Sequence, residues 1–284
     1  MSIFEAILLG IIQGLTEFLP VSSSGHLVLF HMIFGVEEPT LFFDTMLHVG
    51  TLAAVFAVLW QDIWAILRKL VQPLTLYLII ATVPITLCAL VFRNQLEDAF
   101  ETGRFLGVSF LVTSALLITA ELLAKRTKNI STDSAAANCL KNPGEMSWRD
   151  ALVIGAMQAV AVLPGVSRSG ATLSGALSRR LDRDFAARFS FLLSIPAILG
   201  AVVFQLKDLV KGSAAVEEAA AVTAGGIGVA AIIAGTLSAA IVGFFAVRLM
   251  LKIVREKSLW GFAIYTGVLG TLVLVDQVVL GLVY

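Results

Sequence analysis

The sequence predicts an all-α integral membrane protein made of two inverted-topology repeats, each a re-entrant helical hairpin followed by three transmembrane helices. Three observations support this prediction: an apolar composition, a duplicated segment and the placement of the basic residues. The 284 residues are 58% hydrophobic and 14% charged. Soluble domains are about half apolar and a quarter charged. Because long apolar stretches recur along the whole chain, we expect a single membrane domain over residues 1–284.

One segment occurs twice, 145 residues apart. Residues 2–26 read SIFEAILLGIIQGLTEFLPVSSSGH, and residues 147–171 read SWRDALVIGAMQAVAVLPGVSRSGA. The copies align without a gap, but their reactive residues differ, pairing Glu17 with Val162, Ser23 with Arg168, and His26 with Ala171. One copy offers a carboxylate, a hydroxyl and an imidazole, and the other offers a guanidinium. Together they suit one composite site for a phosphorylated ligand.

Each copy opens a hydrophobic stretch that is too short to span a membrane. A spanning helix takes ~20 apolar residues, but the first run stops at Glu17 and Pro20, and the second stops at Pro164. Such broken backbone is tolerated at membrane depth only inside protein or beside a wet cavity, so we predict two hairpins. Capping-box spacing marks the helix starts, at Ser2 with Glu5 and at Ser147 with Asp150.

Further segments are long and apolar enough to span the membrane: 41–60, 74–92, 105–123, 185–206, 219–247 and 259–283. Three of them follow each hairpin. We therefore expect the first repeat over about 1–123, a cytoplasmic connection over 124–149, and the second repeat over about 150–284. The N-terminus lacks a basic region and a cleavage site, so we expect it to be retained.

The basic residues set the orientation. No Lys or Arg precedes Arg68, whereas loops 61–73, 124–149 and 248–257 each contain at least two. The positive-inside rule places these loops in the cytoplasm. Residues 1–40 then enter and leave the membrane from outside, and residues 150–180 do so from the cytoplasm. The same topology explains the arginines at 179, 180, 183 and 188.

Two opposed broken segments indicate a site near the midplane of the membrane, where the hairpin tips meet. Their Ser and Gly residues suit an anion, through hydroxyls and through backbone N–H groups at helix N-termini. The predicted binding residues are Ser22, Ser24, Gly25, Ser167, Ser169, Gly170 and Thr172. Dinucleotide-binding, P-loop and zinc-binding motifs are absent from the sequence, and no nucleic-acid partner is expected.

Ionisable groups within a membrane are costly and usually functional. Glu17 is predicted to act as a general base or as a ligand of a hard cation. Gln13 lies four residues earlier on the same helix face, where it either supplies an oxygen to that cation or hydrogen-bonds across helices. His31 and His48 are interpreted as structural or interfacial, and Asp44 is interpreted as a helix cap.

Ser23 and His26 stand three residues apart in a turn that contains glycine, the minimum for an activated nucleophile. Either Ser23 attacks with His26 as its base, or His26 attacks while Ser23 orients a phosphate oxygen, and the spacing leaves both open. Arg168 follows Pro164 and Gly165 at the other tip, where its guanidinium can bind phosphate oxygens in a bidentate manner.

These segments give the chain a family resemblance. It resembles bacterial undecaprenyl-diphosphate phosphatases of the bacitracin-resistance type, through QGLTEFLPVSSSGH at 13–26 and PGVSRSGAT at 164–172. The family's (Glu/Gln)-x-x-x-Glu motif falls on Gln13 and Glu17, its serine–histidine pair on Ser23 and His26, and its arginine on Arg168.

The resemblance implies hydrolysis of undecaprenyl diphosphate to the monophosphate and inorganic phosphate, aided by Mg²⁺ or Ca²⁺. That reaction recycles the lipid carrier of cell-wall synthesis and gives bacitracin resistance. It implies a multi-pass protein of the bacterial cytoplasmic membrane, surrounded by lipid, whose active site opens to the outer, periplasmic face. The oligomeric state stays open, with a homodimer as one candidate.

Two other functions fit part of the pattern. Inverted repeats with broken helices are also the design of secondary transporters and lipid flippases. The set Ser23, His26 and Arg168 favours a phosphatase over these. A phosphatidic-acid-type lipid phosphatase has a similar Pro-Ser-Gly-His motif, but it also needs a histidine after its Ser-Arg pair, and the stretch after Ser167 and Arg168 has none.

Overall fold

The computed structural model describes residues 1–35, 41–130, 140–210 and 228–282, and these residues form helices joined by short connections. Within them the only β pairing is an isolated bridge between Lys141 and Leu181. By length and composition, five helices of this part can cross a membrane, or six if one bent pair counts as a span. The prediction of an all-α, multi-pass membrane protein is confirmed at this level.

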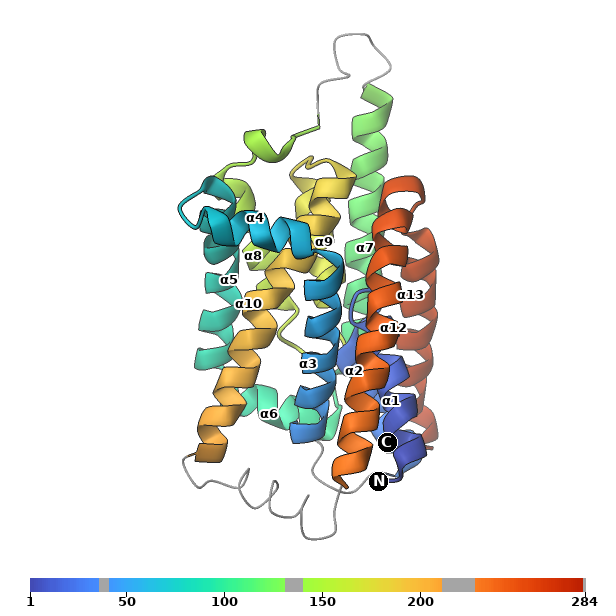
Figure 1. The fold of residues 1–284 in the computed structure, drawn as a ribbon. Coiled ribbons are helices and arrows are strands. Elements are labelled where there is room, and N and C mark those ends of the chain that lie inside the picture. The colour runs from blue at the N-terminus through green and yellow to red at the C-terminus, as the bar shows by residue number, and fades with distance from the viewer. Residues whose placement is uncertain (36–40, 131–139, 211–227, 283–284) are drawn as a thin grey trace.

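The helices follow one another in the order α1 (Ile3–Thr16), α2 (Ser23–Phe34), α3 (Leu41–Val58), α4 (Trp60–Arg68), α5 (Pro73–Val91), α6 (Arg93–Thr102), α7 (Leu106–Ile130), η1 (Pro143–Glu145), α8 (Trp148–Val160), α9 (Arg168–Ser178), α10 (Arg183–Val210), α12 (Val229–Glu256), α13 (Trp260–Val275) and η2 (Asp276–Leu280). Figure 1 shows most of them running along one long axis. The predicted spans correspond to α3, α5, α7, α10, α12 and α13.

Three helices differ from the prediction. Helix α4 forms over Trp60–Arg68, where a loop was expected, after a bend of 79° at the end of α3. Helix α7 continues to Ile130, seven residues beyond the predicted end of its span at 123. Helix α12 continues to Glu256, nine residues beyond the predicted end, and its last turns contain Arg248, Lys252 and Arg255. Because long basic side chains can reach water from the end of a spanning helix, these charged residues did not end α12. Residues 219–227 of the predicted span lie outside the described residues.

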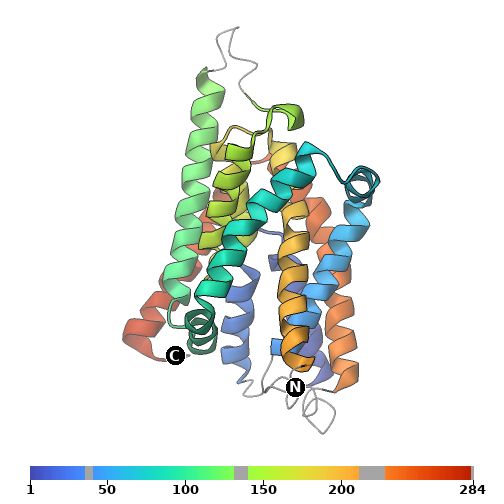
Figure 2. The same ribbon diagram turned by 90° about the vertical axis from the view of Figure 1, so that its left-hand side faces the viewer.

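The duplicated segments form four short helices, as predicted. Capping boxes start α1 at Ser2 and α8 at Ser147. Helix α1 has 14 residues and α2 has 12. At ~1.5 Å per residue neither reaches the ~30 Å of a hydrocarbon core. Figures 1 and 2 place α1 and α2 in the lower half of the molecule and α8 and α9 in the upper half.

The first helix of each copy packs on a helix from the other half of the chain. Helix α1 packs against α12, and α8 packs against α5. Gly10 of α1 faces the Gly235 carbonyl so closely that an added Cβ would collide with it. Gly155 of α8, the equivalent of Gly10, faces Ala81 in the same way, with an ideal Cβ 2.6 Å from the Ala81 oxygen. The duplication therefore extends from the sequence to the packing.

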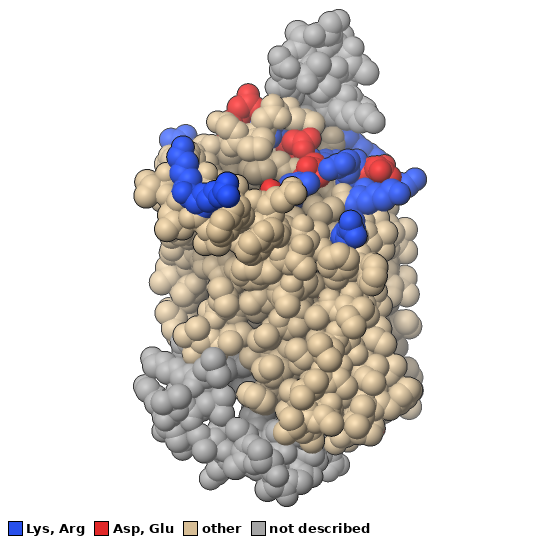
Figure 3. All heavy atoms as spheres, in the orientation of Figure 1, with Lys and Arg blue, Asp and Glu red and all other residues tan. Residues whose placement is uncertain are grey.

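Charged residues gather at the upper end of the face in Figure 3, above a wide surface that shows no charged residues. Asp150, at the start of α8, is buried and accepts hydrogen bonds from Lys141 Nζ at 2.8 Å and Arg179 Nε at 2.7 Å. Burial alone would raise the pKa of Asp150, but the hydrogen bonds from Lys141, Arg179 and Ser147 hold it well below its usual value. This network connects α8, α9 and the segment before them.

Further ion pairs join helices of the two halves. Arg183 donates to buried Glu121 of α7 at 2.7 Å, and Arg188 donates to Asp62 of α4 at 2.8 Å. Arg255 of α12 donates to Asp184 at 2.6 Å. The arginines attributed to topology therefore also tie α4, α7, α10 and α12 together.

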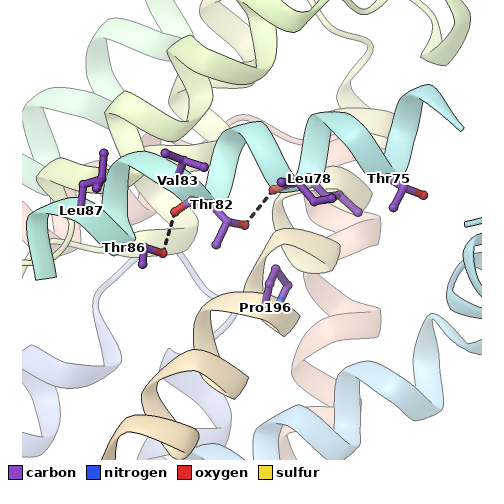
Figure 4. Close-up of a pocket in the computed structure, with 8 residues that line it drawn as sticks. Thr75, Leu78, Thr82, Val83, Thr86, Leu87 and Pro196 are labelled. Carbon is purple, nitrogen blue, oxygen red and sulfur yellow. Dashed lines mark hydrogen bonds between the residues drawn. The ribbon is translucent and has the colours of Figure 1, made fainter. Parts of the chain in front are cut away.

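An apolar groove of about 490 Å³ lies between α5 and α10, with Pro196 on its α10 side (Figure 4). Two of its three threonines turn their hydroxyls back to their own helix: Thr82 donates to the Leu78 carbonyl at 2.7 Å, and Thr86 donates to the Thr82 carbonyl at 3.0 Å. The Thr75 hydroxyl has no hydrogen-bond partner among the described residues. The groove thus presents an apolar lining that suits hydrocarbon, and the polar site lies elsewhere.

Candidate active site

The two helix breaks, after α1 and before α9, lie against each other. Ser169 Oγ donates to the Leu19 carbonyl at 3.0 Å. An ideal Cβ on Gly25 would lie 2.8 Å from Gly165 Cα, so the two backbones touch where side chains would not fit. The structure therefore brings together the two tips that the sequence placed 145 residues apart.

Both copies build the same capped helix start at this contact. Ser22 Oγ accepts the Gly25 amide at 3.3 Å and begins α2, and Ser167 Oγ accepts the Gly170 amide at 3.1 Å and begins α9. The first turn of a helix leaves N–H groups without intrahelical partners, and these favour an anion. Two such N-termini at one place form a suitable cradle for a diphosphate.

Glu17 is the centre of the polar contacts. It is 5% exposed, and its Oε2 accepts hydrogen bonds from Ser23 Oγ at 2.6 Å and from Gln13 Nε2 at 2.9 Å. Its Oε1 forms an ion pair with the Arg168 guanidinium, which comes from the other copy. The composite arrangement expected from the sequence is thus present: one copy supplies the carboxylate and the hydroxyl, and the other supplies the guanidinium.

His26 occupies a different position from the one the sequence suggested. Its Nδ1 lies 2.6 Å from the Ser22 carbonyl, and its Nε2 lies 2.7 Å from the Tyr265 hydroxyl. Ser23 instead directs its hydroxyl at Glu17. The expected hydrogen bond between Ser23 and His26 is therefore not made, because both imidazole nitrogens are occupied. Residue spacing could not show that α13 supplies a competing partner.

His48 was interpreted as structural or interfacial, yet it lies beside Glu17. Its Nε2 is 3.6 Å from Glu17 Oε2, and its Nδ1 is 2.8 Å from the Asp44 carbonyl. The signal that could have found it is an imidazole within a predicted span. The indication in the sequence that Tyr265 belongs to the site is still weaker, since a tyrosine in an apolar helix is common at membrane interfaces.

The other predicted binding residues mostly shape the helix starts. The hydroxyl oxygens of Ser167 and Ser169 lie 3.2 Å apart, and those of Ser22 and Ser24 lie 3.4 Å apart. Thr172 Oγ1 lies 2.5 Å from Ser190 Oγ of α10, and this contact joins α9 to α10. Among these side chains, Ser24 keeps partial exposure. Most of these side chains therefore position the backbone of the two helix starts.

The residues present fit a hard divalent cation. Gln13 Oε1 is buried and has no hydrogen-bond partner within the described ranges. A half-turn of the Gln13 amide would direct this oxygen toward Glu17, giving two oxygen donors of the kind that Mg²⁺ and Ca²⁺ prefer. The described part of the chain contains no group of three or more His, Cys, Asp or Glu placed to hold a metal. Mg²⁺ commonly needs only one or two carboxylates together with substrate phosphates.

Comparison with known proteins identifies relatives over nearly the whole chain. The family model described as "Bacitracin resistance protein BacA" matches residues 6–272. A protein of Carboxydothermus hydrogenoformans named undecaprenyl-diphosphatase is 42% identical over 277 residues, 98% of each chain. An undecaprenyl-diphosphatase 4 of Bacillus thuringiensis subsp. konkukian is likewise 42% identical over 98% of each chain. One of Alkaliphilus metalliredigens is 37% identical, over 96% of this chain and 98% of its own.

Proposed function

We propose, from the premise that this chain belongs to the bacitracin resistance protein BacA family, that it is an undecaprenyl-diphosphatase. It hydrolyses undecaprenyl diphosphate to undecaprenyl phosphate and inorganic phosphate, which recycles the lipid carrier for cell-wall synthesis and gives bacitracin resistance. The observation that carries this proposal is the meeting of Glu17, Ser23 and Arg168 at two capped helix N-termini. A hydroxyl, a carboxylate that accepts its proton and a cation are the parts that phosphoryl transfer needs.

Ser23 attacks the terminal phosphorus and passes its proton to Glu17 Oε2, which already accepts the hydroxyl at 2.6 Å. The new bond joins Ser23 Oγ to phosphorus, and the bond from phosphorus to the bridging oxygen breaks, so the lipid monophosphate leaves. Water then attacks the phosphorus of the phosphoserine, and the bond from phosphorus to Ser23 Oγ breaks. Glu17 returns its proton to Ser23 Oγ, one water proton stays on the new P–OH group, and the other passes to a phosphate oxygen. Phosphate leaves, and the serine is regenerated.

Arg168 and the helix N-termini stabilise the charge on the transferred group. In the structure Arg168 pairs with Glu17 and keeps 15% of its side chain exposed, so it can turn to the phosphate oxygens when the substrate enters. Charge on the equatorial oxygens is the main demand of phosphoryl transfer. His26 as the nucleophile is less well supported, because its Nε2 would first have to leave Tyr265.

Gln13 and Glu17 would hold Mg²⁺ or Ca²⁺. The ion supplies charge neutralisation for the diphosphate oxygens. Glu17 would then have two roles, as ligand and as proton acceptor. The hydrogen bond from Ser23 positions it for the second role, and the hydrogen bond from Gln13 would give way to the ion when the Gln13 amide turns.

The same proposal assigns the topology. Residues 1–123 and 150–284 form inverted repeats, each with a re-entrant hairpin, because α1 with α2 and α8 with α9 occupy opposite halves of the molecule. The end with the ion-paired arginines faces the cytoplasm by the positive-inside rule. Helices α1 and α2 then open to the outer face of the cytoplasmic membrane, where the diphosphate enters while the isoprenoid chain stays in lipid.

Phosphate release from undecaprenyl diphosphate by the purified chain in detergent tests the function. We expect release that stops with EDTA and returns with Mg²⁺ or Ca²⁺, and that is lost in Ser23→Ala. A matched variant, Ser178→Ala, removes an exposed hydroxyl at the end of α9 and should keep the activity. A wild-type protein that is folded and releases no phosphate would refute the assignment, and a transporter of the same architecture would behave in that way.

A further inference from the structure

The Tyr265 hydroxyl contacts a residue of the site from the far end of the chain. It lies 2.7 Å from His26 Nε2, although 239 residues separate the two. Tyr265 belongs to α13 and His26 to the first turn of α2. This hydrogen bond therefore joins the last long helix to the helix start that presents Ser23.

The hydrogen bonds of His26 determine where its proton sits. The Ser22 carbonyl, 2.6 Å from Nδ1, can only accept, so Nδ1 must carry a hydrogen. In the neutral imidazole Nε2 is then an acceptor, and the Tyr265 hydroxyl can donate to it. One tautomer satisfies both partners, with no nitrogen left for Ser23.

Ring contacts hold the imidazole in the same orientation. The Tyr265 ring stacks on His26 with centroids 5.8 Å apart and planes 10° apart, and Phe110 meets the imidazole edge-to-face at 5.4 Å. His26 is 4% exposed. Packing thus restrains the ring, and the Tyr265 hydroxyl selects its hydrogen-bonding state.

The held histidine in turn supports a strained turn. Ser22 has φ of +74°. Backbone of this kind costs a non-glycine residue ~1–3 kcal/mol and persists only where several contacts enforce it. Its carbonyl is bonded by His26 Nδ1, and its hydroxyl caps α2. Ser23 is the next residue, so the direction of its hydroxyl depends on this turn.

We propose that Tyr265 is a positioning residue of the site: its hydroxyl donates to His26 Nε2 and holds the ring in place, and His26 Nδ1–H then supports the Ser22 turn that aims Ser23 at Glu17. Tyr265 acts through His26 and does not touch the reacting atoms. The kinetic part of this inference rests on the proposed phosphatase function, whereas the hydrogen bond from Tyr265 to His26 does not.

Tyr265→Phe tests the inference, because it removes the hydroxyl and keeps the stacked ring. The chain has three histidines, so ¹⁵N labelling of the imidazoles gives a simple spectrum in detergent. The resonances missing from His26→Gln identify His26. We expect wild type to show a protonated Nδ1 and a hydrogen-bonded, unprotonated Nε2. In Tyr265→Phe, Nε2 should shift toward the value of an acceptor without a donor. Tyr77→Phe, on α5, is the matched control and should shift neither nitrogen.

Kinetics supply the second readout. A misplacement of a reacting group by ~1 Å can cost ~10²-fold in rate, so kcat of Tyr265→Phe should fall by about tenfold or more, with KM little changed. An unchanged Nε2 resonance in Tyr265→Phe would overturn the proposed contact. An altered resonance with wild-type kcat would overturn the positioning role. If wild type itself releases no phosphate, the proposed function fails, and the resonances still decide whether Tyr265 holds His26.

Discussion

The Glu17 carboxylate and the Arg168 guanidinium form an ion pair across 151 residues of sequence. Each comes from one copy of the duplicated segment, and each stands beside a helix N-terminus that the same copy builds. The pair is nearly buried, with exposed side-chain fractions of 4% for Glu17 and 15% for Arg168. Removing one partner of such a pair leaves an unpaired charge in a protein interior, which is strongly destabilising.

Arg168→Lys should lose most of the activity. Lysine keeps a positive charge but lacks the planar fork that grips two oxygens. Losing one preorganised donor to a developing oxyanion typically costs ~10²–10³ in rate. We expect Lys and Ala variants to release phosphate at similarly low rates. Arg168→Lys keeps a charge beside Glu17 and should elute as wild type, whereas Arg168→Ala leaves Glu17 unpaired and should also lose stability. A folded Arg168→Lys protein with full turnover would remove Arg168 from the site.

Glu17→Gln keeps the shape of the side chain and removes its charge. The amide cannot take the Ser23 proton, so we expect turnover to fall by ~10²-fold or more. The rate of phosphate release at saturating substrate measures the turnover of Glu17→Gln. Glu5→Gln, in the exposed first turn of α1, is the matched control for loss of a carboxylate. Near-normal turnover in Glu17→Gln would end the assignment of Glu17 as base or ligand.

Gln13→Glu should preserve activity when a divalent cation is present. Gln13 Nε2 lies 2.9 Å from Glu17 Oε2, so a glutamate would place a second carboxylate against the first. Two buried carboxylates repel unless a proton or a cation lies between them. We therefore expect Gln13→Glu to bind Mn²⁺ more tightly than wild type in a titration followed by electron paramagnetic resonance. Weaker Mn²⁺ binding would argue against an ion at this place.

Gly10→Ala should loosen the packing of α1 on α12. The added methyl would collide with the Gly235 carbonyl, which is backbone and cannot move alone. Overpacking of this kind costs about 1–3 kcal/mol, so the midpoint of thermal unfolding in detergent should fall. Gly200→Ala is the control, since a Cβ there meets no described atom within 4 Å. Its midpoint should stay or rise, and a Gly10→Ala midpoint equal to wild type would contradict the close approach.

Cys139 should be accessible only from the cytoplasm. The residue lies outside the described ranges, within the connection 124–149 that the basic residues place inside. With Cys88 changed to Ser, an impermeant thiol reagent should label permeabilised cells and spare intact ones. A cysteine introduced at Ser2 should behave in the opposite way. Labelling of Cys139 in intact cells would reverse the proposed orientation.

The sequence alone determined that the chain is an all-α, multi-pass membrane protein. Apolar runs of ~20 residues set the spans because a helix must cover the hydrocarbon core. The duplicated segment predicted the capped helix starts before Ile3 and Trp148, because capping depends on residues within one turn. It also predicted that Glu17 and Arg168 belong to one site, since one copy contains the carboxylate and the other contains the guanidinium.

Only the tertiary structure decided which groups meet. Ser23 and His26 are three residues apart, yet Ser23 turns to Glu17, while His26 turns to Tyr265 of α13. His48 reaches the site from α3, and α4 forms a helix where a loop was expected. Local spacing constrains helix starts and shared faces, but a hydrogen bond goes to whichever partner packing brings within reach. For His26 that partner lies on α13, 239 residues along the chain.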